Sequence, residues 1–117
     1  MNVLFIVLND LVYLDEILEE LVNQKVKGAT IIESQGMASA ILHNKGLNLI
    51  YGSLFKIRTS EIDEQSKTIF TVINDEKTLE NVVEGINKIV ERSKKRVIGF
   101  MFTVPVSGIY PLKQKQK

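Results

Sequence analysis

The sequence has no cysteine and a single histidine, His43, and each shortage removes a class of chemistry. Without cysteine the chain has no disulfide, no thiolate metal ligand and no cysteine nucleophile, which suits a reducing compartment such as the cytoplasm. One histidine cannot form a multi-histidine metal site. It also cannot serve as the base of a Ser-His-Asp relay and leave a second histidine available as a base. A trimer could bring copies of His43 together on an axis, but we interpret it as an exposed loop residue.

A charge excess is also absent, because 15 lysines and arginines stand against 14 aspartates and glutamates. This balance gives no overall attraction to nucleic acid or to an anionic membrane. The apolar run at residues 3–8 has no basic leader and is far too short to span a bilayer. We therefore expect a cytoplasmic protein with no nucleic-acid partner and no direct membrane insertion.

Residues with catalytic spacing are missing as well. The sequence has no Gly-rich phosphate loop, and neither Ser39 nor Ser53 lies in a nucleophile motif. The acidic residues of segment 15–20 could hold a hard cation, but their helical spacing places them opposite an apolar stripe and favours a solvated face. We predict that the protein is not an enzyme.

The clearest pattern that is present is an internal repeat. The segment FIVLNDLVYLDEILEEL begins at Phe5 and FTVINDEKTLENVVEGI begins at Phe70, and the two align without a gap. Two copies are too few for a solenoid, which needs about three repeats. The repeat therefore predicts one pseudo-symmetric domain over residues 1–113, followed by a frayed polar tail at 114–117.

Each copy is predicted to begin with a strand that leads into a helix. Apolar, partly β-branched runs at residues 3–8 and 69–73 are typical of buried strands. An Asn-Asp pair ends each run, and Asp10 or Asp75 can cap the helix that follows. In both helices the apolar residues recur at helical spacing, which predicts that the helices lie on a sheet.

Second strands at 29–34 and 97–104 complete the two units. The predicted fold is therefore an α+β, ferredoxin-like βαββαβ sandwich, with a four-stranded antiparallel sheet and two helices on one face. The other face would carry residues such as Val97, Phe100 and Phe102, and we expect another subunit to bury it. Stacking of nucleic-acid bases on these aromatics is the alternative, as in some ferredoxin-like RNA binders.

The connection between the units is a predicted loop at residues 37–66. It is far longer than the usual connection of about 4 to 6 residues, so we expect it to contribute to function. Its first half is apolar, which predicts packing on the domain or on a neighbouring subunit.

Taken in order, these features resemble the PII signal-transduction family. The resemblance rests on an Asp-led helix, the segment KGATIIESQGM, a long loop, TVINDEKTLENVVEGI and a closing FMFTVPVSGIYPLK. It implies a homotrimer with ligand clefts between subunits, used for adenine nucleotides and sometimes for 2-oxoglutarate. It also implies a mobile loop that docks on a transporter or an enzyme.

The resemblance assigns ligand contacts to a set of positions, which are matched one at a time. Thr30 matches a threonine on the second strand, Gly36 matches the glycine that opens the loop, and Gly99 matches a glycine before the last strand. Ile73 falls where the backbone faces an adenine. The full set of predicted ligand-binding residues is Thr30, Gly36, Met37, Ser39, Ile73, Gly99 and Lys113.

Several polar family positions differ in this chain. Phe100 stands where the family has a phosphate-binding lysine, Pro111 and Lys113 replace two arginines, and Ala40 replaces a glutamine. A triphosphate needs several charge-assisted donors or backbone amides. The basic turn at 94–96 is one set of groups that could take over this role.

The sequence thus predicts a PII-like regulatory protein that binds a small metabolite or nucleotide between subunits and signals to a partner protein through its loop. An adenine nucleotide is the one cofactor that the resemblance suggests. The alternative is a trimeric adaptor of the same fold that binds no ligand, or a CutA-like trimer. The missing phosphate contacts favour that alternative.

Overall fold

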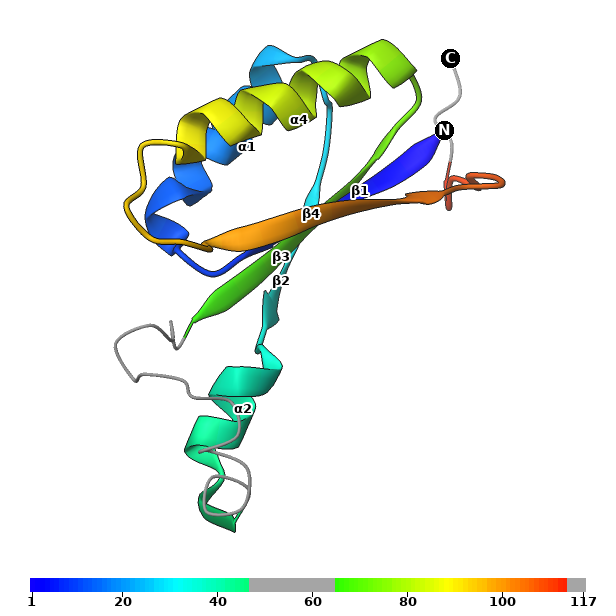
Figure 1. The fold of residues 1–117 in the computed structure, drawn as a ribbon. Helices are drawn as coiled ribbons and strands as arrows, with labels where there is room; N and C mark the ends of the chain where they lie inside the picture. Colours follow the sequence, from blue (N-terminus) through cyan, green and yellow to red (C-terminus); the bar gives the residue numbers. More distant parts are fainter. Residues whose placement is uncertain (47–64, 114–117) are drawn as a thin grey trace.

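The computed structural model describes residues 1–46 and 65–113 (Figure 1). The segment 47–64, which contains most of the predicted loop, and the predicted tail at 114–117 lie outside the described residues. The elements are β1 (Asn2–Leu8), a 3-10 turn η1 (Leu11–Tyr13), α1 (Leu14–Asn23), β2 (Thr30–Ser34), α2 (Met37–His43), β3 (Ser66–Ile73), α4 (Glu76–Val90) and β4 (Gly99–Pro105).

The four strands form one antiparallel sheet in the order β2-β3-β1-β4. β1 is central, and its residue Phe5 lies between Phe70 of β3 and Phe102 of β4. β2 pairs with β3, beginning with Thr30 opposite Phe70. Helices α1 and α4 cover the same face of this sheet (Figure 1). The predicted ferredoxin-like α+β fold is confirmed.

The core lies between the sheet and these two helices. Alternate residues of β1 point to the helices and are buried, as the two-residue period of a strand requires. The predicted apolar stripes of α1 and α4 supply the opposite side. The buried apolar residues are Leu4, Ile6, Leu8, Tyr13, Ile17, Leu21, Ile69, Ile73, Leu79, Val82 and Ile86.

Of the two predicted helix caps, Asp75 caps α4 directly, whereas Asp10 caps the 3-10 turn η1 that precedes α1. Oδ1 of Asp10 accepts a hydrogen bond from the backbone N–H of Val12 at 3.2 Å, and Oδ2 of Asp75 accepts one from the backbone N–H of Thr78 at 2.9 Å. The two repeats differ in one respect, because the 3-10 turn η1 precedes α1 whereas α4 begins directly after its cap. Of the acidic residues in segment 15–20, Asp15 and Glu19 are exposed and Glu16 and Glu20 are half-buried, so none is in the core.

The connection between the repeats begins as a helix rather than as a loop. Gly36 is the N-cap of α2 in an extended conformation, and the alanines that follow favour helix. α2 projects beyond the end of β2, away from α1 and α4 (Figure 1). His43 is exposed, as predicted, but it is the last residue of this helix and does not lie in a loop.

The face of the sheet opposite α1 and α4 is apolar, and no described helix covers it (Figure 1). The rings of Phe5 and Phe102 stack with their centroids 4.7 Å apart, and Phe70 lies on the other side of Phe5 at 5.7 Å. We call this surface the open face. By strand register its larger apolar residues are Val3, Phe5, Val7, Ile32, Phe70, Val72, Phe100, Phe102 and Val104.

One residue predicted for the open face is not part of it. Val97 lies in the connection before β4, which begins two residues later at Gly99. The apolar run at the end of the second repeat therefore enters the sheet later than the sequence pattern indicated. Phe100 and Phe102 do lie on the open face, as predicted.

Candidate functional site

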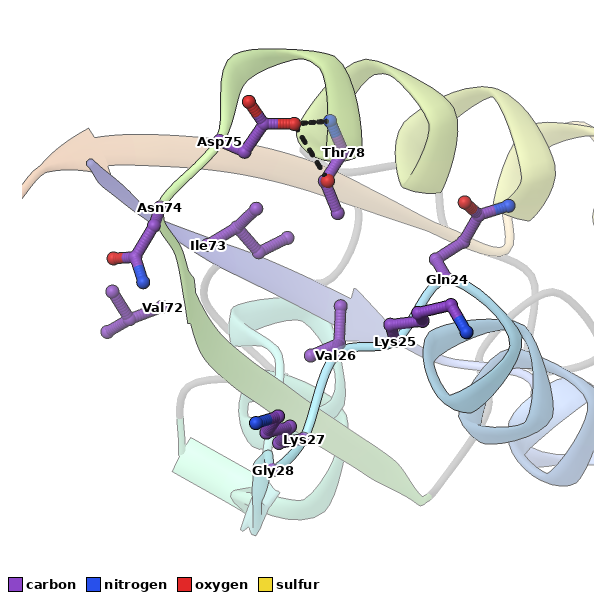
Figure 2. A pocket seen from close by; sticks show the side chains of 10 residues that line it. All are labelled: Gln24, Lys25, Val26, Lys27, Gly28, Val72, Ile73, Asn74, Asp75 and Thr78. Carbon is purple, nitrogen blue, oxygen red and sulfur yellow. Dashed lines mark hydrogen bonds between the residues drawn. The ribbon is translucent and has the colours of Figure 1, made fainter.

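A pocket of about 390 Å³ lies where α1 ends and where β3 leads into α4 (Figure 2). Its lining comes from residues 24–28, residues 72–75 and Thr78 in the first turn of α4. Val72 and Ile73 supply apolar surface, and several polar and charged side chains surround them. Pockets of about 300 to 1,000 Å³ with apolar walls and a few polar groups are typical of small-molecule sites.

The end of α1 builds the first wall of this pocket. The backbone N–H of Val26 donates to the carbonyl oxygen of Leu21, and the N–H of Lys25 donates to that of Val22, each at 2.9 Å. This pair of bonds is a Schellman ending, which places the residue after the C-cap in the left-handed conformation. Lys25 accordingly has a φ of 66°, the one positive φ of a non-glycine residue in the described ranges.

The separation of β2 from β3 builds the second wall. The two strands are paired only as far as Thr30 opposite Phe70, so the chain before Thr30 moves away from the end of β3. A side-chain bond spans the start of this gap, because the hydroxyl of Thr71 donates to the carbonyl oxygen of Gly28 at 2.5 Å. The space between the diverging segments is the pocket.

The start of α4 closes the pocket on its third side. Oδ2 of Asp75 accepts hydrogen bonds from the backbone N–H and from the hydroxyl of Thr78, each at 2.9 Å (Figure 2). The backbone bond, with the hydroxyl bond second, holds the pKa of the Asp75 carboxyl below its usual value. Asp75 is therefore a charged group that is held to the helix.

Lys25 and Lys27 are the cations of the pocket. Both are exposed, and among the residues that the structure describes neither forms an ion pair. They lie on either side of Val26, with Lys27 beside Gly28 and Lys25 at the end of α1 (Figure 2). Their long stems allow the ammonium groups to move over the pocket mouth.

The second repeat has a hollow at the corresponding connection. It measures about 430 Å³ and is lined by residues 94–97 between α4 and β4. Here Nζ of Lys95 lies 3.3 Å from Oδ2 of Asp10, which is the repeat counterpart of Asp75. Asp10 thus caps its turn through one oxygen and pairs with a lysine through the other, whereas Asp75 places both of its bonds on Thr78.

Comparison with protein families agrees with this architecture. The family described as nitrogen regulatory protein P-II matches residues 1–116. The chain belongs to the P-II family. The resemblance inferred from the sequence is therefore confirmed, and P-II proteins are regulatory rather than enzymatic. No individual curated protein matches the chain.

Two of the ligand positions that the P-II resemblance implied lie at the pocket or beside it. Ile73 is buried and lines the pocket. Thr30 is exposed at the first residue of β2, two residues beyond Gly28. These two positions share one end of the β2-β3 pair.

Three further P-II positions lie at the opposite end of β2. Gly36 precedes α2, and Met37 is exposed at its start. Ser39 is buried, and its hydroxyl has no hydrogen-bond partner among the described residues. Because β2 runs from the pocket to α2, a single chain does not bring these residues to the pocket.

The last two P-II positions lie neither at the pocket nor at the start of α2. Gly99 has a φ of 151°, and a Cβ at this position would collide with the carbonyl oxygen of Val7. This collision is a structural reason for the glycine. Lys113 is exposed in the segment after β4. Within one subunit the predicted ligand residues therefore do not form one site.

Sequence reasoning missed Lys25, Lys27 and Thr78 as residues of the pocket. It placed the second strand at residues 29–34, but the pocket depends on where β2 leaves β3, which the hydrophobic pattern does not give. No sequence signal marks Lys25, because a Schellman ending usually has glycine in its left-handed position and here the nearest glycine, Gly28, comes three residues later.

The described residues contain neither a metal-binding cluster nor a membrane-spanning helix. Over residues 1–46 and 65–113, no group of three or more histidine, aspartate or glutamate side chains is arranged to hold a metal ion. In the same part of the chain, the helices are too short or too polar to cross a bilayer.

Proposed function

We propose that this P-II family member is a cytoplasmic, non-enzymatic regulator that binds a small metabolite or an adenine nucleotide in clefts between the subunits of a homotrimer. The ligand changes the conformation of the connection at 37–66, and this change alters the affinity for a partner protein such as a transporter or an enzyme. Linkage requires that the ligand prefer one conformation of the connection over another.

The position of Val72 is the observation that most directly supports this proposal. Its side chain lies on the open face and is 39% exposed, and the same residue lines the pocket. A second subunit packed on the open face would stand next to the pocket and add a wall to it. The subunit interface would then form part of the ligand-binding site.

The composition of the open face favours a subunit contact. Phe100 is 60% exposed and Phe102 is 44% exposed, although both are large apolar residues. Fully burying such a side chain contributes about 1.5 to 3 kcal/mol, and monomeric proteins rarely leave contiguous apolar patches exposed. Three copies arranged about an axis would bury the three faces in one closed assembly.

β2 offers a route from the pocket to the connection. The strand begins next to the pocket at Thr30 and ends at Ser34, two residues before Gly36 caps α2. Its far end is joined to β3, because the hydroxyls of Ser34 and Ser66 are 2.8 Å apart. A ligand that holds the start of β2 can therefore affect both ends of the connection.

A mass measurement and a thermal-shift screen test this function. Light scattering of the full chain should give the mass of a trimer. Among ATP, ADP, AMP, cyclic dinucleotides, 2-oxoglutarate and bicarbonate, at least one should raise the melting temperature, since a ligand at about 100 times its Kd stabilises by about 2.7 kcal/mol. The same ligand should change protease cleavage within residues 44–66. A trimer whose melting and cleavage respond to none of these compounds would contradict the sensor.

A pair of variants tests the role of the open face. Phe102→Asp places a charge in the centre of the face and should give a smaller particle that no longer binds the ligand. Val12→Asp is the matched control, because Val12 is 71% exposed in η1 and lies off the open face. Retention of the trimer mass by Phe102→Asp would show that subunits meet elsewhere.

The second candidate function is an adaptor trimer that binds no ligand, or a CutA-like trimer. Phe100 favours it, because the residue in place of the family's lysine has its ring 6.0 Å from that of Phe102 and belongs to the open face. Position 100 thus serves the apolar surface and not an anion. An intact trimer with no thermal response in the screen would support this function.

A further inference from the structure

We propose that the turn at residues 24–28 binds an anion, with Lys25 and Lys27 holding the phosphate or carboxylate group of the ligand. This inference deepens the proposed function, because it places the charged end of that ligand in the pocket. It predicts the binding of small anions, and this prediction can fail or hold independently of the proposed function.

The comparison between the two repeats is the first reason. Each repeat has a basic helix-to-strand connection next to an aspartate that follows a strand. At the connection of the second repeat, Asp10 of the first repeat pairs with Lys95 at 3.3 Å, while Lys94 and Arg96 form no ion pair with the described residues. At the connection of the first repeat, Asp75 of the second repeat places both of its bonds on Thr78, so neither Lys25 nor Lys27 has an anionic partner in the described residues. The aspartate beside the first connection thus leaves both of its lysines available to a ligand.

The backbone of Lys25 is the second reason. A left-handed conformation is unfavourable for a residue with a side chain, and glycine avoids this cost. The Schellman ending of α1 places Lys25 in that conformation at a φ of 66°. A lysine at a position where glycine fits better, on the rim of a pocket, points to a use for its side chain.

The other walls of the pocket determine which way the ligand lies. Asp75 repels an anion from the start of α4, so the charged group belongs on the side of residues 24–28. Asn74 and Asp75 then face hydrogen-bond donors of the ligand, and Val72 and Ile73 face its apolar part. The site fits a small molecule with an anionic group at one end and neutral polar groups at the other.

Two simple anions provide the test. ¹⁵N-labelled full-length protein is titrated with inorganic pyrophosphate and, separately, with succinate at constant ionic strength, and amide shifts are followed by NMR. We expect saturable shifts centred on residues 24–28. The anion that binds with the lower Kd identifies phosphate or carboxylate as the preferred group. Since exposed ion pairs are worth up to about 1 kcal/mol, removing one lysine should weaken binding about fivefold.

The variants are chosen to keep the fold. Lys25→Asn removes the charge and tolerates a positive φ, and Lys27→Gln keeps the length of the side chain. Lys94→Gln is the matched control, because Lys94 is an exposed lysine in the corresponding connection of the second repeat. The two pocket variants should bind more weakly, and the control should bind as the unaltered protein does.

The outcomes separate the inference from the proposed function. No saturable shift at residues 24–28, or binding that Lys94→Gln weakens and the two pocket variants do not, would overturn the anion site. Anion binding through Lys25 and Lys27 in a protein that is not a trimer would keep the site and refute the intersubunit regulator. A trimer that binds a nucleotide or 2-oxoglutarate equally well without these lysines would keep the regulator and refute the site.

Discussion

Replacing Lys25 with glycine should stabilise the protein while weakening its affinity for anions. Lys25 is exposed and has a φ of 66°, and its backbone N–H donates to the carbonyl of Val22. Glycine keeps that hydrogen bond and removes a conformational cost of about 1 to 2 kcal/mol. The greater conformational freedom of glycine in the unfolded chain offsets about 0.5 to 1 kcal/mol of this gain in stability. The difference is a net gain of about 0 to 1.5 kcal/mol, with its midpoint at about 0.75 kcal/mol.

Urea unfolding followed by circular dichroism measures this gain. Both proteins are compared at the same concentration, because the midpoint of an assembling protein depends on concentration. The midpoint should rise by a few tenths of a molar unit with an unchanged slope. In the NMR titration the same variant should bind pyrophosphate about fivefold more weakly.

Lys27→Gly is the matched control for this prediction. Lys27 is also an exposed lysine of the turn, but its φ is not positive, so glycine relieves no strain there. The control should lose about 0.4 to 1 kcal/mol of stability through the entropy of the unfolded chain. Equal destabilisation by Lys25→Gly would refute the reasoning, since the Lys25 side chain would then stabilise the fold by more than its backbone strain costs.

Three further changes test the fold around the site. Gly99→Ala should destabilise by about 3 kcal/mol in urea unfolding, because the new Cβ collides with the carbonyl of Val7 and β4 must move away from β1; a neutral effect would show that this strand end is free to shift. Ile17→Ala should cost about 2 to 5 kcal/mol and Ile17→Val about 0.5 to 1.5, since Ile17 is fully buried, and equal losses would argue against a packed site. For Asp75 the native pKa lies below the value of 3.8 for the free group, so its contribution is present above that pH and is lost as the pH falls through the native pKa. The stability gap between the unaltered protein and Asp75→Asn, measured in urea from neutral pH to about pH 2, should therefore shrink below about pH 4; a constant gap would contradict this origin.

Helices α1 and α4 and the four strands could be predicted because they depend on local patterns. The stripe that includes Ile17 and the Asp75 cap follow from helical spacing and from cap chemistry, and both are found in the structure. The apolar run of β1 indicates an uncovered surface as well as a strand. Leu4 faces the helices while Phe5 faces the open side, so a run without alternation indicates a second surface to be covered.

The pocket could not be predicted, because it depends on non-local geometry. The sequence pattern indicates a strand at residues 29–34, but only the register that starts at Thr30 opposite Phe70 shows that β2 leaves the end of β3 exposed. The left-handed conformation of Lys25 is likewise invisible to a pattern that expects glycine at such a position. Both features arise from how the end of α1 meets a strand that is distant in sequence.

Position 100 carries two predictions from the sequence. Phe100 stands in place of a family lysine, and the strand pattern also predicted that it lies on the uncovered face of the sheet. In the structure it lies opposite Val7 of β1 on the open face, and its ring neighbours that of Phe102. The same replacement that removes a cation therefore extends an apolar surface.

The position of β2 leads to a prediction about how the pocket and the connection are coupled. β2 is an edge strand, and four of its five residues are exposed, so it is held mainly by its pairing with β3. Weakly packed edge elements open with low free energies. An anion held by residues 24–28 restrains the chain immediately before Thr30, and this should favour the paired state of the whole strand.

Hydrogen exchange in the presence and absence of pyrophosphate measures this coupling. Amides from Ile31 to Ser34 should exchange more slowly when the anion is bound, while amides of β1 in the centre of the sheet should be unchanged. The protection cannot exceed the differential affinity of the anion for the paired and unpaired states. Slower exchange confined to residues 24–28 would mean that the turn binds anions without affecting α2, and signalling would then need a route that does not pass along β2.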